Sequence, residues 1–446
     1  MKIVIVGAGD VGTHLAKLLS NDDHDIVLLD DNEEKLKHIA AHIDLMTIAG
    51  VAHSISDQQE AGVAKADLFI AVTPSEERNL VACILAKDLG AAKTIARVDS
   101  SEYLKISNQD KFRELGVDEL IYPENLAAKE ICTSLKQVGS RQMLQFSGGK
   151  LVVNAIKVRD NASIVNKTLE EISKAHPCFR AVSINRNNET IIPRGKDVIL
   201  PQDVVYFIST QGDMPSLFNV AGKNMFEVKN VMILGGSRIG LKTAKRLEER
   251  GNYNVKVIEM NKDRSIFAAD FLEKSLIINA DGRDVELLKE EGLETMDAFV
   301  AVTGNAETNI LSCHLAKRLG VRRTVAEVEN LDYIRLADEI GIGTLINKKL
   351  IAASYIYRFT MEAEVSIMKC LTACDADVLE FIAKPDSKVC RKKVRDINFP
   401  ENATIGGIIR GNSGFIANGD TQIEVGDKVV VFALPNVLKK LEKFFR

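Results

Sequence analysis

The chain opens with a repeated alternation of apolar and mixed segments. The apolar run that ends Ile3-Val4-Ile5-Val6 makes residues 2–6 a strand buried on both faces. A helix is expected from about Val11 to Leu19, and a second strand from Asp25 to Leu29. Further strands are expected at 68–72, 94–98 and 119–121. Strands that alternate with helices predict an α/β fold with a Rossmann-like, doubly wound parallel sheet.

An internal repeat organises the whole chain. The segment Asp67–Thr73 returns as Asp297–Thr303, at an offset of 230 residues. A second pair of similar segments, 191–205 and 415–430, begins at an offset of 224 residues. Length alone predicts about three domains, whereas the repeat predicts four modules in the order A-B-A-B.

The A modules are the predicted Rossmann units, and the B modules are predicted to be small α+β units. Residues 141–210 hold short apolar segments separated by turns that contain Asn, Gly and Pro. The stretch from Asn125 to Val138, after Pro123, is predicted to be a helix that leads out of the first sheet, and 211–228 resembles a linker. The expected segments are 1–122 (A), 123–139 (exit helix), 140–215 (B), 216–228 (linker), 229–345 (A), 346–364 (exit helix) and 365–446 (B).

Composition narrows the class of protein. The chain has 446 residues, a formal net charge of −4 and 46% hydrophobic residues. A nearly neutral balance argues against nucleic acid as a partner, which would require a basic face. No uninterrupted apolar stretch of about 18 residues is present, so no membrane span is expected. Seven scattered cysteines favour a reducing cytoplasm, and the N-terminal residues run directly into a strand without a signal peptide.

The first candidate site is a glycine loop between the first strand and the first helix. In dinucleotide-binding sheets the first glycine allows a tight turn, the second lets backbone N–H groups approach a pyrophosphate, and the third lets the helix pack on the strand. The helix N-terminus adds partial positive charge for the phosphates. Asp30, 18 residues past the last glycine, would accept hydrogen bonds from ribose hydroxyls and repel a 2′-phosphate. This favours NAD or an adenine nucleotide over NADP. The loop consists of Gly7, Ala8, Gly9, Asp10, Val11 and Gly12.

A second, altered loop follows the first strand of the second half. Ser237 stands where the middle glycine is expected, so its Cβ would crowd a pyrophosphate, whereas Arg238 would add positive charge. Glu259 takes the place of Asp30. The sequence leaves two interpretations open: a degenerate loop kept as scaffold, or a second site with a different ligand or affinity. The loop consists of Gly235, Gly236, Ser237, Arg238, Ile239 and Gly240.

Residues at the carboxyl ends of later strands extend both candidate sites. Arg97 follows a strand in the first half, where its guanidinium could reach a phosphate, and its repeat partner Glu327 would repel one. Conversely, Asp281 in the second half corresponds to Val51, and its carboxylate could contact a ribose or an adenine edge.

Two further dipeptides lie where ligands bind in open parallel sheets. They are Thr73-Pro74 in the first half and Thr303-Gly304 in the second.

The sequence offers little for catalysis. An NAD-dependent oxidoreductase with two fused Rossmann halves is the main alternative, and it needs a general acid or base poised in a cleft. The B modules show no His with a carboxylate partner and no activated Tyr or Lys. Cys370 and Cys374 are close in sequence, but a lone pair of this kind indicates core packing rather than a metal site. We therefore expect neither catalytic residues nor a metal.

Taken together, the motifs resemble a known family. The A modules resemble RCK N-terminal domains, through Gly-Ala-Gly-x-x-Gly, Asp30, the apolar segment that ends at Thr73, and Ala-Arg97-Val. The B modules resemble RCK C-terminal domains, through Ile-Ile-Pro-x-Gly at 191–195 and Pro-Gln-Asp at 201–203. Two tandem copies resemble the peripheral regulatory subunits of Trk-type potassium uptake systems.

The resemblance implies a non-catalytic protein that binds NAD(H), with ATP or ADP as further ligands. It implies self-association into a cytoplasmic ring, expected as a tetramer, at the inner face of the membrane. The partner would be an integral membrane, potassium-translocating subunit of the TrkH/TrkG type. A sensing subunit for a different transporter shares these motifs and stays open. The implied first site is Gly7 to Val11, Asp30, Thr73, Pro74 and Arg97, and the implied second site is Gly235 to Ile239 and Glu259.

Overall fold

The computed structural model describes residues 1–20, 24–136, 139–187, 189–223, 226–361, 363–371 and 374–446. The chain forms two compact units. The first contains Met1–Leu126 and Lys348–Thr360, and the second contains Ala127–Asn347 and Met361–Arg446. Among the described residues, no helix is long and apolar enough to cross a membrane.

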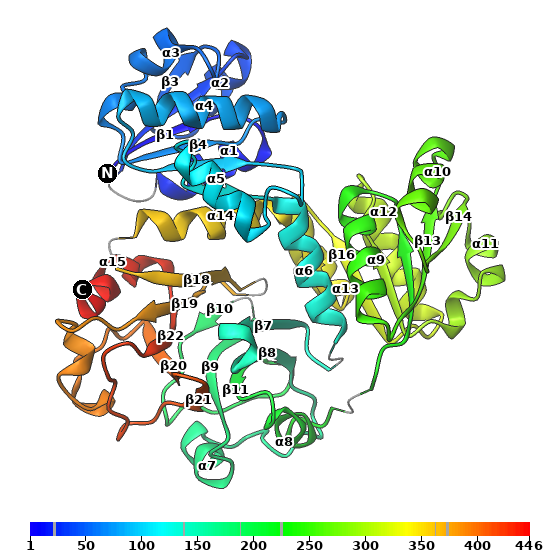
Figure 1. Ribbon diagram of the computed structural model, residues 1–446. Helices are drawn as coiled ribbons and strands as arrows, with labels where there is room; N and C mark the ends of the chain where they lie inside the picture. The colour runs from blue at the N-terminus through cyan, green and yellow to red at the C-terminus, as the bar shows by residue number, and fades with distance from the viewer. Residues whose placement is uncertain (21–23, 137–138, 188, 224–225, 362, 372–373) are drawn as a thin grey trace. The chain divides into compact units, whose positions relative to one another are not determined.

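The first unit contains a six-stranded parallel sheet in the order β3-β2-β1-β4-β5-β6. Helices cover both faces of this sheet (Figure 1), which explains why Ile3 to Val6 are all fully buried. The doubly wound parallel sheet predicted from the sequence is confirmed. Its elements are β1 Lys2–Val6, α1 Asp10–Leu19, β2 Asp25–Asp30, α2 Glu33–Ala40, β3 Met46–Ala49, α3 Ile55–Glu60, β4 Leu68–Ala71, α4 Glu76–Leu89, β5 Thr94–Arg97, α5 Ile106–Glu114 and β6 Glu119–Ile121.

The exit helix of the second half also belongs to the first unit. This helix, α14 (Lys348–Tyr357), packs against α1 and is followed by a short 3-10 turn, Arg358–Thr360. The exit helix of the first half, α6, spans Pro123–Leu135. Proline is well tolerated at the first helical position because its missing N–H has no partner there. The predicted end at Val138 lies outside the described residues.

The second unit repeats the parallel sheet, in the order β14-β13-β12-β15-β16-β17. The strand order matches that of the first sheet element by element, as the internal repeat predicts. Its elements are β12 Asn230–Leu234, α9 Arg238–Arg250, β13 Asn254–Glu259, α10 Lys262–Phe271, β14 Leu276–Asn279, α11 Val285–Glu290, β15 Ala298–Ala301, α12 Ala306–Arg318, β16 Arg323–Glu327, α13 Leu331–Ile340 and β17 Thr344–Ile346.

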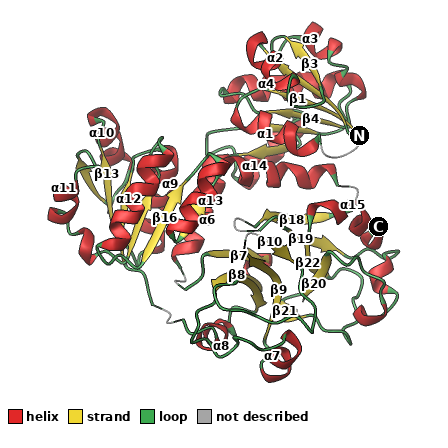
Figure 2. Ribbon diagram, turned by 180° about the vertical axis from the view of Figure 1, so that it is seen from behind, coloured by secondary structure: helices red, strands yellow, loops and turns green. Residues whose placement is uncertain are grey.

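Each B module contains a five-stranded antiparallel sheet. The strand orders are β10-β9-β11-β8-β7 and β18-β19-β22-β20-β21. The two sheets lie against each other (Figure 2) and share one core, to which Phe146 and Val153 contribute from one module and Val430 and Phe432 from the other. The elements are β7 Gln142–Phe146, β8 Leu151–Lys157, α7 Leu169–Ala175, β9 Phe179–Arg186, β10 Glu189–Ile191, β11 Val204–Ser209, α8 Met214–Val220, β18 Val365–Cys370, β19 Asp377–Ile382, β20 Ala403–Arg410, β21 Ser413–Ile416, β22 Lys428–Ala433 and α15 Leu438–Phe445.

The interpretation of 211–228 as a plain linker is wrong over α8. The Gly-Asp-Met-Pro sequence suggests a break, but the proline lies in the first turn of this helix, where it is tolerated. Met214, Leu217 and Phe218 are buried in the core of the first B module. The helix therefore completes that module, and the expected boundary at residue 215 cuts through it.

Candidate nucleotide-binding sites

The backbone of the first glycine loop requires glycine at two positions. Gly7 has φ +105°, and a Cβ there would lie 2.9 Å from the backbone nitrogen of Thr73. A Cβ on Gly12 would lie 1.9 Å from the carbonyl oxygen of Gly7. The first glycine thus makes the turn and the third lets α1 pack directly on the loop, which are the roles that the spacing predicts.

Gly9 differs from these two because nothing near it would collide with a side chain. It is the residue before α1, it has φ −77°, and no side chain caps the helix there. A Cβ on Gly9 would meet nothing within 4 Å. The N–H groups of the first helical turn therefore face open space, as an anion would require.

The acid at the end of β2 is tied to the loop. One carboxylate oxygen of Asp30 accepts a hydrogen bond from the backbone N–H of Ala8 at 2.6 Å. The other accepts the N–H of Asn32 at 2.9 Å. Because the carboxylate is only partly buried, it remains available to a ribose next to the loop.

The remaining residues of the first loop differ in accessibility. Val11 is buried under the helix, whereas the Asp10 side chain is 66% exposed. The ammonium of Lys349, from α14, lies 3.2 Å from the Asp10 carboxylate. The exit helix of the second half thus brings a positive charge to the start of α1, which the repeat alone did not predict.

The carboxyl ends of β4 and β5 are joined by one buried side chain, Asn79. Its amide oxygen accepts hydrogen bonds from the backbone N–H and the hydroxyl of Thr73, and its amide nitrogen donates to the carbonyls of Thr73 and Arg97. The predicted site residues Thr73 and Arg97 are therefore held side by side. Pro74, the next residue, is exposed.

Arg97 already has an ionic partner. Its guanidinium lies 3.0 Å from one carboxylate oxygen of Glu124, in the first turn of α6. The other oxygen of Glu124 is buried and accepts no hydrogen bond. An incoming phosphate would therefore compete with Glu124 for Arg97.

The second loop repeats the turn but caps its helix differently. Gly235 has φ +108°, and a Cβ on Gly240 would lie 2.1 Å from its carbonyl oxygen. Ser237 occupies the position of Gly9. Its hydroxyl oxygen accepts the N–H of Gly240 at 3.3 Å and donates to the carbonyl of Val302 at 2.7 Å. The serine thus takes the place of an anion at the helix N-terminus, in addition to narrowing the approach.

Glu259 reproduces the contacts of Asp30. Its carboxylate accepts the N–H of Gly236 at 2.7 Å and that of Asn261 at 2.8 Å. A Cβ on Gly236 would lie 2.9 Å from this carboxylate. The pairing of acid and loop is therefore the same in both halves.

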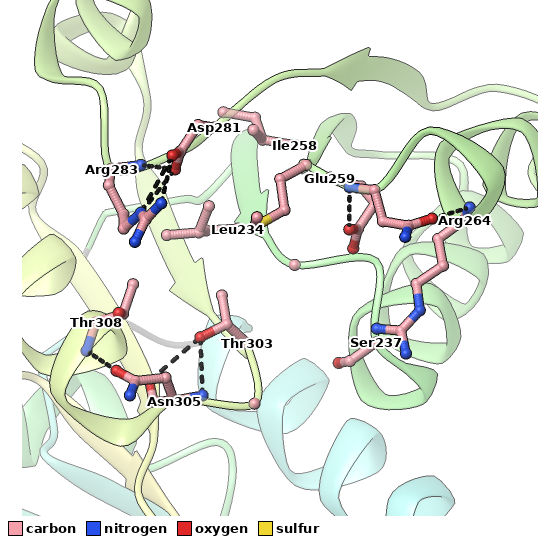
Figure 3. Close-up of a pocket in the computed structure, with 15 residues that line it drawn as sticks. Leu234, Ser237, Ile258, Glu259, Arg264, Asp281, Arg283, Thr303, Asn305 and Thr308 are labelled. Atoms are coloured by element: carbon pink, nitrogen blue, oxygen red, sulfur yellow. Dashed lines mark hydrogen bonds and ion pairs between the residues drawn. The ribbon is translucent and has the colours of Figure 1, made fainter.

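A pocket of about 560 Å³ opens beside the second loop (Figure 3). The structure brings six of the predicted residues to it, whereas Gly236, Arg238, Ile239 and Gly240 do not line it. The lining residues are Leu234, Gly235, Ser237, Ile258, Glu259, Met260, Asn261, Arg264, Asp281, Gly282, Arg283, Thr303, Gly304, Asn305 and Thr308.

Two arginines in this pocket were not predicted. Arg283 donates to both carboxylate oxygens of Asp281, and this pairing holds the pKa of Asp281 below its usual range. Arg264 lies on α10 and extends along the same side of the pocket as Ser237 (Figure 3). The internal repeat could have indicated Arg264. Asn261 caps α10 through the N–H of Arg264, just as Asn32 caps α2 through that of Lys35, so both halves carry a cation at this position.

Two cysteines, one in each half of the chain, are too deeply buried to act as nucleophiles. Cys83 and Cys313 are fully buried, and their thiols lie 3.4 and 3.3 Å from strand carbonyls. Burial raises the pKa of both thiols, that of Cys313 to about 12. Among the residues that the structure describes, no three His, Cys, Asp or Glu side chains gather as metal ligands do.

Two parallel sheets with glycine loops, each followed by an antiparallel module, define a tandem RCK protein. The TrkA-N domain family matches residues 3–123 and 231–348, and the TrkA-C domain family matches 154–222 and 378–446. The chain belongs to the TrkA family, as the resemblance predicts.

Relatives of known name match over the whole length. "Trk system potassium uptake protein TrkA homolog 2" of Methanosarcina mazei is 32% identical, with 100% of both chains covered. "Trk system potassium uptake protein TrkA" of Haemophilus influenzae is also 32% identical, with 100% of this chain and 99% of the relative covered.

Solved structures share the fold. The GsuK RCK domain matches at TM-score 0.63 and 15% identity, over 100% of this chain and 94% of that one. A structure described as the GsuK channel bound to NAD matches at TM-score 0.62 and 15% identity, over 100% of this chain and 78% of that one.

Proposed function

We propose that this protein is the nucleotide-sensing regulatory subunit of a Trk-type potassium uptake system. It binds NAD(H) or an adenine nucleotide at its glycine loops and gates an integral membrane, potassium-translocating partner, without catalysing a reaction. It assembles into a ring, a tetramer, at the inner face of the membrane. The names of its full-length relatives support the system to which it belongs.

The pocket at the second loop is the observation that carries the nucleotide part of this proposal. It combines the turn at Gly235, the acid Glu259 and the cations Arg264 and Arg283 around one cavity of about 560 Å³. A ribose needs the acid, and phosphates need the cations and the backbone. The residues present therefore fit a nucleotide, although Ser237 must release the helix N-terminus before a phosphate can take it.

The first loop is proposed as a second nucleotide site with its own preference. Its helix start at Gly9 is uncapped and open, whereas its strand-end cation Arg97 is held by Glu124. A phosphate that displaces Glu124 changes the ionic environment of the first turn of α6. We infer that this exchange is how the first site communicates with the rest of the chain.

Several sites acting together provide enough free energy for gating. One site contributes about 1–3 kcal/mol of coupling, whereas shifting a gate from closed to open needs roughly 5.5 kcal/mol. A ligand shifts the equilibrium only by its difference in affinity for the two states. The coupling free energies of equivalent sites in a symmetric ring can add up to the free energy that gating requires.

Nucleotide binding is tested by calorimetric titration with NADH, NAD, ATP, ADP and NADP. Gly9→Val should abolish binding at the first loop and Gly304→Val at the second, because a Cβ meets nothing within 4 Å at either glycine and the fold is preserved. Gly212→Val is the matched control, since its nearest neighbour is 3.9 Å away and it lies in neither site. Unchanged nucleotide affinity in both Gly9→Val and Gly304→Val would contradict the proposal.

Gating is tested by potassium flux. The membrane partner is reconstituted in vesicles with the full-length protein, and nucleotide-dependent uptake is compared between the wild type and Gly9→Val. We expect nucleotide to change the flux only with the wild type. Steady oxidation of NADH in the presence of carbonyl substrates, without any effect on flux, would instead indicate an oxidoreductase.

A further inference from the structure

Positive side chains from separate elements gather in the second unit without carboxylate partners. Lys157 ends β8, Arg159 follows it, and Lys223 follows α8. Among the described residues none of these three forms an ion pair. Lys317, near the end of α12, donates only to the carbonyl of Gly341, at 2.6 Å. Such a concentration of charge is unexpected in a chain whose net charge is −4.

Backbone contacts show how these elements converge. Arg141 donates its N–H to the carbonyl of Ala155, two residues before Lys157. The hydroxyl of Thr344 donates to the carbonyl of Arg141 at 2.7 Å, and Thr344 lies three residues after Gly341, the partner of Lys317. The B module and the second parallel sheet therefore meet at Arg141, with lysines on both sides.

Two lysines of this region feel the neighbouring positive charges. Partial burial, and after it the nearby charges of Arg159, Arg141 and Lys157, together lower the pKa of Lys223 to about 8. Burial, Arg141 and Lys157 also lower the pKa of Lys317.

A buried arginine contacts the chain beside Arg141. Arg323, at the start of β16, is 3% exposed and donates one N–H to the carbonyl of Ser140, the residue before Arg141. Its Nε and second terminal nitrogen have no hydrogen-bond partner, and neither has the buried hydroxyl of Ser140. Burying a guanidinium without a counter-charge is unfavourable, and an anion nearby would offset this.

We propose that this basic cluster is a binding site for a compact anion with more than one phosphate group. It is separate from both glycine loops. The cluster consists of Arg141, Lys157, Arg159, Lys223 and Lys317, and Arg323 lies beside it at Ser140.

The ligand class follows from the number and the setting of the charges. Among the described residues, four cations without ion pairs, Lys157, Arg159, Lys223 and Lys317, exceed what a carboxylate or a single phosphate would balance. Lys157, Lys223 and Arg141 are partly buried, so the site suits a small solute better than a long polyanion. A bound anion would also remove the repulsion that depresses the pKa of Lys223.

The test uses the full chain and inorganic pyrophosphate. The Gly9→Val/Gly304→Val protein, whose glycine loops are blocked, is titrated calorimetrically at constant ionic strength. We expect one site per chain with a dissociation constant below about 1 mM. Adding Lys157→Gln and Lys223→Gln should weaken binding at least about tenfold, whereas adding Lys65→Gln and Lys388→Gln should not. Equal binding by the two charge variants, or no binding at all, overturns the proposal.

A second readout separates a ligand site from a structural cluster. The ammonium of Lys223, followed by NMR, should titrate near pH 8 without ligand and at higher pH with pyrophosphate. Without ligand, Lys223→Gln should match or exceed the thermal stability of the parent protein, because it removes repulsion. A lower melting temperature would indicate a structural role and contradict the proposal.

Lipid headgroups also carry phosphate groups, so a third experiment tests binding to lipid vesicles. Sedimentation with phosphatidylserine vesicles is compared with sedimentation with phosphatidylcholine vesicles. We expect neither to retain the protein through these lysines. Retention that depends on Lys157 and Lys223, without any pyrophosphate binding, would assign the cluster to a membrane surface and overturn the small-solute proposal.

Discussion

Asn79 holds Thr73 through three hydrogen bonds. Its amide oxygen lies 2.9 Å from the backbone nitrogen and 2.7 Å from the hydroxyl of Thr73, and its amide nitrogen lies 3.0 Å from the carbonyl oxygen. In the second half, Asn309 holds Thr303 with the same three contacts. The two copies thus keep one buried amide at the carboxyl edge of the sheet.

Asn79→Ala should lower the free energy of unfolding by about 2–4 kcal/mol, because buried hydrogen-bonding groups of Thr73 and Arg97 lose their partner. The measurement is urea denaturation. Asn309→Ala is the matched variant for the second half, and Asn108→Ala, on an exposed part of α5, is the surface control. A loss no larger than that of the surface control would show that the amide does not fasten the strand ends.

Ser237→Gly should raise nucleotide affinity at the second loop. Glycine removes the side chain that now accepts the N–H of Gly240, and it frees the helix N-terminus for a phosphate. Glycine at a cap position lowers stability by only a few tenths of a kcal/mol, whereas alanine lowers it by about 1 kcal/mol. Calorimetric titration of Ser237→Gly beside Ser237→Ala separates the two effects. If affinity does not rise in the glycine variant, the serine does not obstruct the site.

Glu124→Gln should tighten nucleotide binding at the first loop. The amide keeps a hydrogen-bond acceptor for Arg97 but removes the charge that competes with a phosphate. We expect about tenfold higher nucleotide affinity. In the absence of ligand the free energy of unfolding should fall by about 1–3 kcal/mol, since a charge-assisted hydrogen bond is weakened. Glu77→Gln, on an exposed side chain, is the control. Weaker binding in Glu124→Gln would contradict competition for Arg97.

The sequence predicted what depends on local geometry. Glycines at Gly7 and Gly12 are required by the turn itself, and the acids Asp30 and Glu259 end strands whose apolar runs are unmistakable. The short edge strands β3 and β14 were not predicted, because Met46 and Leu276 are exposed on them and their apolar runs are brief.

Contacts between distant residues could not be predicted. Arg97 and Glu124 are 27 residues apart, and nothing near Arg97 in sequence shows that its charge is paired. Likewise, Arg264 and Arg283 reach one pocket from different elements. The exit helix α14 packs against α1 of the first half, although no pattern within α14 specifies which sheet it joins.

Asp30→Asn should reduce discrimination against NADP. The amide oxygen still accepts the N–H of Ala8, so the loop keeps its shape, whereas the exposed N–H of Asn32 loses its acceptor and the repulsion of a 2′-phosphate is lost. The ratio of NAD to NADP affinity should fall by about 10- to 100-fold. This corresponds to roughly 1.4–2.8 kcal/mol of repulsion between the partly exposed carboxylate and the 2′-phosphate. The experiment uses the Gly304→Val background, which blocks the second loop. Asp25→Asn, at the other end of β2, should leave the ratio unchanged; a ratio unaffected by Asp30→Asn would exclude ribose recognition by this acid.

His14 should make the protein less stable in mild acid. Burial on α1 lowers its pKa from the ordinary value of 6.5, and Lys17 and Lys349 lower it further. Above pH 6.5 the imidazole is neutral in both the folded and the unfolded chain, so it has no effect there. Below pH 6.5 the unfolded chain binds a proton that the folded chain resists, so stability falls as the pH drops.

His14→Gln removes this proton-binding difference while keeping a polar side chain of similar length. Denaturation of both proteins between pH 5 and 8 should give curves that differ by a constant above about pH 7, where His14 is neutral in both states. The wild type should then lose stability faster than the variant as the pH falls below 6.5. His38→Gln, which alters an exposed histidine on α2, is the control and should follow the wild type. Parallel curves for His14→Gln and the wild type throughout would mean that folding does not lower the pKa of His14.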